Sequence, residues 1–186
     1  FDQQWRSALA CVVVVAMVVL SCVPTFWRPA RLASVWVIGT GLFYVLMKGG
    51  VLGLPYIGED KWGGLGLTLL IFVATCLIGF PLSILLALLR RSELPVISKG
   101  VGLLIDAVRS LPLLSILFAF AVVVPFMLPS WLQTGKLYRV ICGTALFFAA
   151  YQAEIIRGGM QGVATGQDEA AKSLGIGYWH RISRII

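Results

Sequence analysis

Residues 62–89 read WGGLGLTLLIFVATCLIGFPLSILLALL, and this stretch decides the fold class. It contains no charged side chain. A bilayer core about 30 Å thick is crossed by roughly 20 apolar helical residues, so the stretch is long enough to cross a membrane as one helix. Pro81 lacks a backbone donor and crowds the preceding turn, and Gly79 stands two residues before it. We therefore expect a kink near residues 77–81, which serves either as a hinge for transport or as an ordinary packing kink.

The rest of the chain is also apolar. Of its 186 residues, 59% are hydrophobic and 12% are charged, whereas soluble domains carry about one quarter charged residues. Four further apolar stretches reach or approach spanning length, at residues 7–23, 33–47, 111–128 and 137–153. The second is the weakest, because Lys48 and nearby glycines cut it short and allow a tilted or partly interfacial helix. We predict an all-α integral membrane protein with about five transmembrane helices and one cytoplasmic loop.

The positive charges predict the orientation of these helices. The net charge is +7, and ten of the 15 Lys and Arg residues fall in segments 24–32, 90–110 and 154–186. Loops rich in Lys and Arg are retained on the cytoplasmic side. We therefore place Phe1 outside and the tail from Arg157 onward in the cytoplasm.

Two pairs of opposite charges stand at the predicted cytoplasmic border. Asp106 precedes Arg109 by three residues, and Glu154 precedes Arg157 by the same spacing, so each pair lies on one helical face and can neutralise itself. Ionisable groups near lipid are costly and often functional, which makes all four residues candidates for a gate or a substrate contact. The alternative is that they are interfacial pairs that hold helix ends together.

Residues 157–186 are too polar to span a membrane and are patterned as a helix, a turn and a second helix. Thr165 followed by Asp168 has the spacing of a capping box, and Gly175 is a typical helix stop. The pattern predicts a helix of about nine residues. Its predicted common face consists of Gln167, Ala170, Ala171 and Leu174. A helix this short is marginal alone, so we expect it to dock on another surface.

The sequence lacks the common nucleotide-binding and catalytic motifs. It contains no Walker A phosphate loop, no dinucleotide-binding fingerprint, no nucleophile elbow and no zinc-protease motif. The four cysteines lie in apolar stretches without metal-ligand spacing, and no basic run with interleaved aromatics suggests nucleic-acid binding. We expect no catalytic residue, no metal, no cofactor and no nucleic-acid partner.

The polar loop resembles the EAA motif of ABC importer permeases. Glu169, Ala170 and Ala171 are followed by Gly175 and then by Ile185 at the spacing of that motif. The stretch AEIIRGG at residues 153–159 and the Gly-Gln pair at 166–167 are similar to the polar amino acid branch of these permeases, which serves histidine, glutamate, glutamine, arginine and opines. The stretch RSLPL at residues 109–113 agrees with that branch, although its serine stands where glycine is common.

The resemblance covers residues 62–186 and implies a permease core cut after the EAA loop. Residues 1–61, with about two apolar helices, resemble the N-terminal region of general L-amino acid permeases. The short helix would be a coupling helix that docks on a cytoplasmic ABC ATPase dimer. The chain itself would not be an enzyme. The residues implied in coupling are Gln167, Glu169, Ala170, Ala171, Leu174 and Gly175.

The resemblance also implies partners and a location. These are a second permease copy or a related permease, a periplasmic or extracellular amino-acid-binding protein, and the lipid of a bacterial cytoplasmic membrane. Two other classes stay open: a secondary amino acid transporter driven by an ion gradient, and a membrane scaffold without transport. The short helix favours the importer, because neither alternative gives it a purpose.

Overall fold

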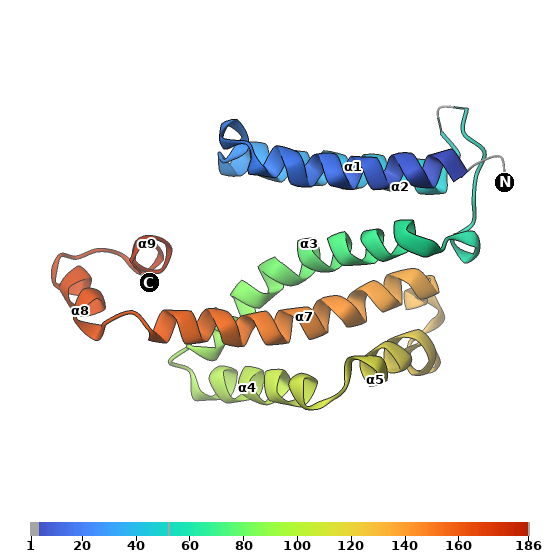
Figure 1. Ribbon diagram of the computed structural model, residues 1–186. Helices are drawn as coiled ribbons and strands as arrows, with labels where there is room; N and C mark the ends of the chain where they lie inside the picture. The colour runs from blue at the N-terminus through green and yellow to red at the C-terminus, as the bar shows by residue number, and fades with distance from the viewer. Residues whose placement is uncertain (1–3, 52, 186) are drawn as a thin grey trace. The chain divides into compact units, whose positions relative to one another are not determined.

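The computed structural model describes residues 4–51 and 53–185, which form helices and loops without a strand among them (Figure 1). Phe1, expected outside, lies beyond the described residues. The helices are α1 (Gln4–Cys22), α2 (Pro29–Lys48), α3 (Gly64–Arg90), α4 (Pro95–Ser110), α5 (Leu113–Phe118), α6 (Val124–Met127), α7 (Lys136–Gln161), α8 (Thr165–Ser173) and α9 (Tyr178–Arg184). A π-helical segment, Ala119–Val123, joins α5 to α6, and short 3-10 turns occur at Pro24–Phe26, Glu59–Lys61 and Ser130–Leu132.

Within the described residues, four helices are long and apolar enough to cross a membrane, namely α1, α2, α3 and α7. This confirms four of the five predicted spans. The second predicted span, which we considered the weakest, forms the 20-residue helix α2, because the helix begins at Pro29, ahead of the apolar stretch. It ends where Gly49 adopts a φ of 68°, a backbone conformation that glycine tolerates best. The helix α3 continues through Pro81.

The remaining predicted span, residues 111–128, is not one straight helix. It consists of α5, the π-helical segment and α6, and together with α4 it forms a helix pair bent by 103°. The bend lies at Leu111, whose ψ of 142° is extended. Pro112 causes this, because a proline disfavours the helical conformation of the residue before it. The pair is therefore either one broken span or a re-entrant loop.

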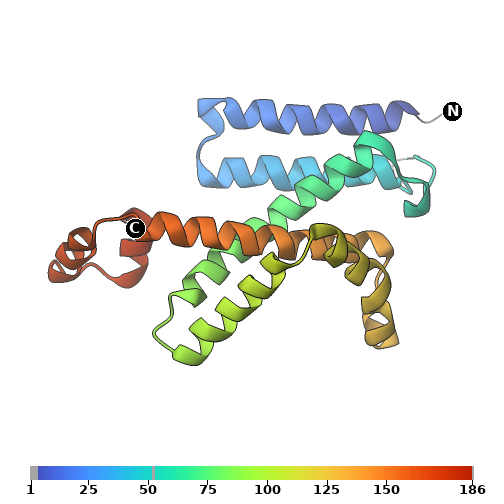
Figure 2. The same cartoon turned by 60° about the horizontal axis from the view of Figure 1, so that its bottom comes forward.

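The chain divides into two compact units, each built from two segments. The described part of residues 1–77 and residues 117–144 form the first unit, and residues 78–116 with the described part of 145–186 form the second. In the first unit, α1 and α2 run side by side in both views (Figures 1 and 2). Their apolar core also includes side chains from the start of α3, and its buried members are Ala10, Val14, Met17, Phe43, Met47, Trp62, Leu70 and Val73.

A buried arginine fixes the end of this hairpin. Arg6 on α1 is 1% exposed. Its Nε donates to the carbonyl of Leu46 and its Nη1 donates to the carbonyl of Pro55, both over 2.9 Å. The arginine thereby satisfies a carbonyl at the C-terminal end of α2, where a positive charge also suits the helix dipole.

The second unit contains the later halves of α3 and α7 together with α4, α8 and α9. Small residues bring α3 and α7 close: a Cβ added at Gly79 would lie 2.6 Å from Cδ1 of Phe148 and 3.1 Å from the carbonyl oxygen of Ala145. Fully buried alanines line the same part of α7, at Ala149, Ala150 and Ala153. This close contact places the charged ends of α3, α4 and α7 within reach of one another.

Candidate functional site

An ion-pair cluster joins three helices of the second unit at the carboxylate of Glu154 on α7. Its Oε1 lies 2.8 Å from Nη1 of Arg90 on α3. Its Oε2 lies 2.8 Å from Nη2 of Arg157, one turn further along α7, and 3.8 Å from Nη1 of Arg109 on α4. Arg90 also donates to both carboxylate oxygens of Asp106 on α4, each over 3.2 Å. Three guanidinium groups face two carboxylates, so the cluster carries one net positive charge.

The two carboxylates of the cluster differ in exposure. The side chain of Glu154 is 14% exposed, whereas that of Asp106 is 56% exposed. The guanidinium of Arg109 is further held over the ring of Tyr151, 5.3 Å from its centroid, and the Tyr151 hydroxyl donates to the Arg109 carbonyl. Glu154 is therefore the centre of the cluster, since it is the less exposed carboxylate and the one that contacts all three arginines.

Of the two predicted charge pairs, one is confirmed and one is wrong. Glu154 pairs with Arg157, as the spacing predicted. Asp106 and Arg109 do not pair with each other among the ion pairs of residues 4–51 and 53–185. Asp106 contacts Arg90 instead, and Arg109 reaches toward Glu154. The packing of α4 against α3 and α7 offers each residue an opposite charge on a neighbouring helix.

Sequence reasoning overlooked Arg90, which contacts both carboxylates. It follows the apolar stretch that decided the fold, and no site role was predicted for it. Its partners lie 16 and 64 positions later in the chain, at Asp106 and Glu154. The available signal was an arginine in the last turn of a membrane helix beside acidic residues on other segments.

The predicted coupling helix corresponds to α8, which has the nine residues expected. The capping-box prediction is wrong: Ala164 occupies the N-cap position, and no side chain caps the helix. Because the helix starts one residue earlier than the pattern implied, Asp168 is its fourth residue. There it contacts Lys172 at 2.7 Å within α8 and Arg181 on α9 at 3.0 Å.

Asp168 therefore ties α8 to α9 through charge. The hydrogen bond from Lys172 is the main cause that holds the pKa of the Asp168 carboxyl below its ordinary value, and the charges of Lys172, Arg181 and Arg91 lower it further. An aspartate is already ionised at neutral pH, and the lowered pKa keeps this carboxyl ionised further into the acid range, so the contact between the two helices persists there.

The end of α8 is closed as the sequence predicted, with Gly175 in the left-handed conformation at a φ of 70°. The Ile176 N–H donates to the carbonyl of Ala171, and the Gly175 N–H donates to that of Lys172, which together make a Schellman motif. This arrangement satisfies two of the carbonyls that a helix end leaves without partners. The turn after α8 is thus set by backbone bonds as well as by charge.

The predicted common face of α8 is divided by its packing. Of its predicted members, Ala171 is 3% exposed and faces the protein, whereas Gln167, Ala170 and Leu174 are exposed. Glu169, which was not predicted on that face, is exposed as well. Leu174 is 78% exposed. No ion pair of the described residues involves the Glu169 side chain, which lines a groove of about 340 Å³. This short helix is suited to contact with another protein, because it exposes the charged Glu169, the small Ala170 and the large apolar Leu174.

Nothing in the described residues has the form of a metal site. No group of three or more His, Cys, Asp or Glu side chains among them is placed to hold a metal ion. The four cysteines are free. Two arrangements of the second unit are candidate functional sites, the Glu154 cluster and the exposed face of α8.

The chain matches a known protein family and is similar to known transport proteins. Residues 79–186 match the family model described as the binding-protein-dependent transport system inner membrane component. The chain is 38% identical to the inner membrane amino-acid ABC transporter permease protein YhdY of Escherichia coli K12 over 96% of its own length and 49% of that protein. It is 40% identical to the glutamate/glutamine/aspartate/asparagine transport system permease protein BztC of Rhodobacter capsulatus, over 73% of this chain and 31% of that protein.

A solved structure agrees with these relatives. The crystal structure of an amino acid ABC transporter with histidines is 30% identical to this chain, with a TM-score of 0.56, over 66% of this chain and 56% of the other. The chain spans about half the length of YhdY and about a third of BztC. The Glu154 cluster and α8 both lie within the segment that the family model matches.

Proposed function

The chain belongs to the family of binding-protein-dependent transport system inner membrane components, and from that premise we propose that it is a permease subunit of an ATP-driven importer for polar L-amino acids. The relatives YhdY and BztC support this, since both are amino acid permeases by name. In this proposal the protein lies in the bacterial inner membrane, and a separate ATPase hydrolyses the ATP. The boundary at residue 61 between an N-terminal segment and the permease core stays a prediction.

The observation that carries the proposal is that α8 contacts α9 through Asp168 and Arg181 and presents other residues to the solvent. The contact of Asp168 with Arg181 ties α8 to α9 and the Schellman motif sets the turn between them, while Glu169, Ala170 and Leu174 stay open to a partner. A surface that transmits movement must be both stiff and accessible. We infer that α8 docks on the ATPase dimer, that Glu169 supplies a charged contact, and that Ala170 permits close approach.

We further propose that the Glu154 cluster holds α3, α4 and α7 together and does not bind the solute. Both oxygens of Glu154 are engaged by arginines at 2.8 Å, so a solute ammonium would have to displace a guanidinium to reach either one. An ionic tie of this kind suits a part of the permease that moves as one piece when α8 is pulled. A gate or substrate contact at Asp106, Arg109, Glu154 or Arg157 is the alternative role.

The test of the importer is uptake by proteoliposomes that contain the full-length protein with its ATPase, permease partner and binding protein. Glu169→Lys should reduce ATP-driven uptake of labelled L-glutamine and L-glutamate about ten-fold or more, because it reverses a charge at a protein contact. Glu93→Lys is the matched control, since Glu93 is another exposed acid of the second unit outside α8.

Both variants should be present in the membrane in normal amounts, which immunoblotting can check. Uptake that survives Glu169→Lys unchanged would contradict the docking role of α8. Uptake that requires an ion gradient but no ATP would overturn the importer and favour a secondary transporter.

A further inference from the structure

The first unit contains a pocket that neither the family match nor the relatives' names assign. It has a volume of about 900 Å³ and lies where the end of α2, the loop before α3 and the starts of α3 and α7 meet. Pockets for small ligands span about 300–1,000 Å³. The lining residues used below are Lys48, Tyr56, Glu59, Leu67, Ile71 and Tyr138, and all but Tyr138 precede the segment that the family model matches.

A chain of hydrogen bonds fixes two opposite charges at this pocket. The Lys48 ammonium donates to the Tyr44 hydroxyl over 2.8 Å. The hydroxyls of Tyr44 and Tyr138 are 2.6 Å apart, and the Tyr138 hydroxyl donates to Oε1 of Glu59 over 2.7 Å. Since the Tyr138 hydroxyl donates its hydrogen bond to Glu59, it must accept a hydrogen bond from the Tyr44 hydroxyl. The Tyr44 hydroxyl in turn accepts a hydrogen bond from Lys48. The donors therefore all run from the cation to the anion, and the two charges are held apart in fixed positions.

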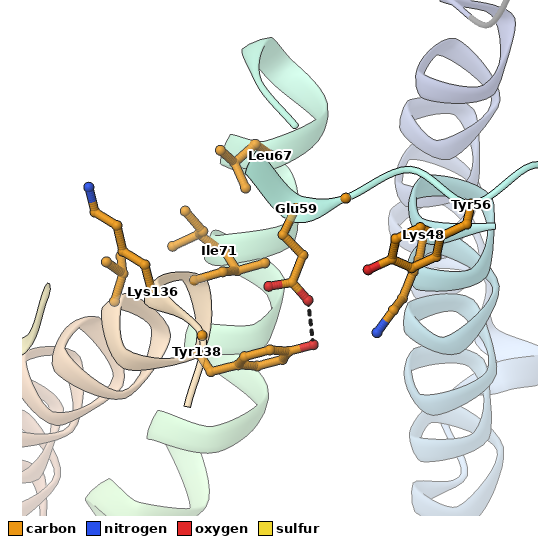
Figure 3. A pocket seen from close by; sticks show the side chains of 11 residues that line it. Lys48, Tyr56, Glu59, Leu67, Ile71, Lys136 and Tyr138 are labelled. Atoms are coloured by element: carbon orange, nitrogen blue, oxygen red, sulfur yellow. Dashed lines mark hydrogen bonds between the residues drawn. The ribbon is translucent and has the colours of Figure 1, made fainter. Parts of the chain in front are cut away.

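The polar ends of these side chains converge on one region (Figure 3). Lys48, Tyr56, Glu59 and Tyr138 turn their polar atoms toward one another, and the dashed bond between Tyr138 and Glu59 marks the middle of the group. The apolar side chains of Leu67 and Ile71 lie beside it on α3. Lys136 also lines the pocket, but its amino group points away from the group. The pocket thus offers one cation, one anion and an apolar wall.

We propose that this pocket binds a free α-amino acid as a zwitterion. The carboxylate of the ligand pairs with the Lys48 ammonium, and its ammonium pairs with Glu59, where Tyr138 occupies Oε1 and leaves Oε2 to the ligand. The side chain of the ligand lies against Leu67 and Ile71. A simple anion or a simple cation would satisfy only one of the two fixed charges and would bring its own charge near a like one.

The inference rests on the proposed function and adds to it a solute site on the first unit. Under the predicted orientation, Lys48, Glu59 and Tyr138 lie toward the outer side, where an amino acid arrives. The fixed charges favour binding because little ordering remains to be done when the ligand enters. The site is a property of the longer N-terminal region, which supplies Lys48, Tyr56 and Glu59.

The test is direct binding to the full-length protein in lipid nanodiscs, without ATP and without a binding protein. Labelled L-glutamine, L-glutamate and L-arginine serve as probes. Glutarate, which has no α-ammonium, and butylamine, which has no carboxylate, serve as competitors. Saturable binding of at least one amino acid, displaced by unlabelled amino acid but at least ten-fold less well by glutarate or butylamine, is the expected result.

Three variants locate the site. Lys48→Met and Glu59→Gln should each weaken binding about 10- to 100-fold, as expected for the loss of one charged hydrogen bond. Lys136→Met is the matched control and should change binding less than two-fold, because that amino group points away from Lys48 and Glu59. An equal loss in all three variants, or no loss in any, would overturn the assignment.

The competitor series uses only the unmodified protein, so it decides the matter even where a variant does not fold. The absence of saturable binding for all three amino acids, or equal displacement by butylamine, would overturn the site. If the same preparation still shows ATP-driven uptake that depends on Glu169, the importer stands and only this pocket fails. If binding is found but uptake is not driven by ATP, the pocket stands and the importer fails.

Discussion

Substitution of Glu154 by glutamine should destabilise the protein more than its single charge suggests. Glutamine keeps the shape of the side chain but leaves Arg90, Arg109 and Arg157 close together without the carboxylate between them. Removing one partner of a fully buried ion pair costs about 3–5 kcal/mol, and an exposed pair contributes about 0–1 kcal/mol. Because the Glu154 side chain is 14% exposed, we expect a loss of about 2 kcal/mol in the free energy of unfolding.

A loss of this size is measurable by thermal unfolding. For chains of 150–250 residues, each kcal/mol shifts Tm by about 2–4 °C, so Glu154→Gln should lower Tm by about 4–8 °C. The assay is differential scanning fluorimetry of the purified full-length protein at low ionic strength. Asp106→Asn is the matched comparison, since it removes the other carboxylate of the same cluster, whose side chain is 56% exposed. It should cost about 0.5 kcal/mol and shift Tm by about 1–2 °C.

The pairing can also be isolated by combining substitutions. If Glu154 stabilises through Arg90, the double variant Glu154→Gln with Arg90→Met should be less damaging than the sum of the two single changes, by about 1 kcal/mol. Equal Tm shifts for Glu154→Gln and Asp106→Asn would refute the reasoning, because burial would then have no bearing on the value of these pairs. A Glu154→Gln shift below 1 °C would refute it as well.

Two further predictions concern other parts of the second unit. Because the pKa of Asp168 is lowered in the folded protein, its contact with Arg181 contributes its full stabilisation above the ordinary pKa of about 3.9. This stabilisation is lost as the pH falls through the lower folded pKa. Protection of α8 against hydrogen exchange should therefore hold at pH 5 and decline below pH 4. Asp168→Asn should remove this dependence, and a decline centred near pH 6 would rule out Asp168 as its source. Gly79→Ala should cost about 1–3 kcal/mol, because its methyl group meets Phe148, whereas Gly100→Ala enters open space and should not lower Tm. Equal Tm values for these two variants would contradict the close helix contact.

The long helices could be predicted from the sequence because the signal for them is local. An uninterrupted apolar run of spanning length, such as residues 62–89, has few other places to be buried. The glycine stop after α8 was equally readable, since Gly175 follows the last periodic residue and takes a conformation that other residues avoid. The bend at Leu111 also has a local cause in the sequence, because Pro112 restricts the backbone of Leu111. Hydropathy alone passes over such a bend, since both sides of it are apolar.

The contacts between distant segments could not be predicted from spacing. Asp106 stands one turn from Arg109, yet it pairs with Arg90, because the packing of α4 against α3 decides which opposite charge is nearer. The pocket of the first unit depends likewise on where Glu59 and Tyr138 meet, and they are 79 positions apart. A single sequence without related sequences holds no record of such pairings. Charged residues at the ends of apolar runs, such as Arg90, are the sequence feature that indicates such contacts.

The buried Arg6 has a consequence for how the protein is made. Two of the carbonyls that accept its hydrogen bonds, those of Leu46 and Pro55, lie 40 and 49 positions further along the chain. A ribosome therefore delivers α1 to the membrane well before these acceptors exist. During that interval these two hydrogen bonds cannot form. The end of the hairpin therefore takes its final form only after α2 and Pro55 have been made.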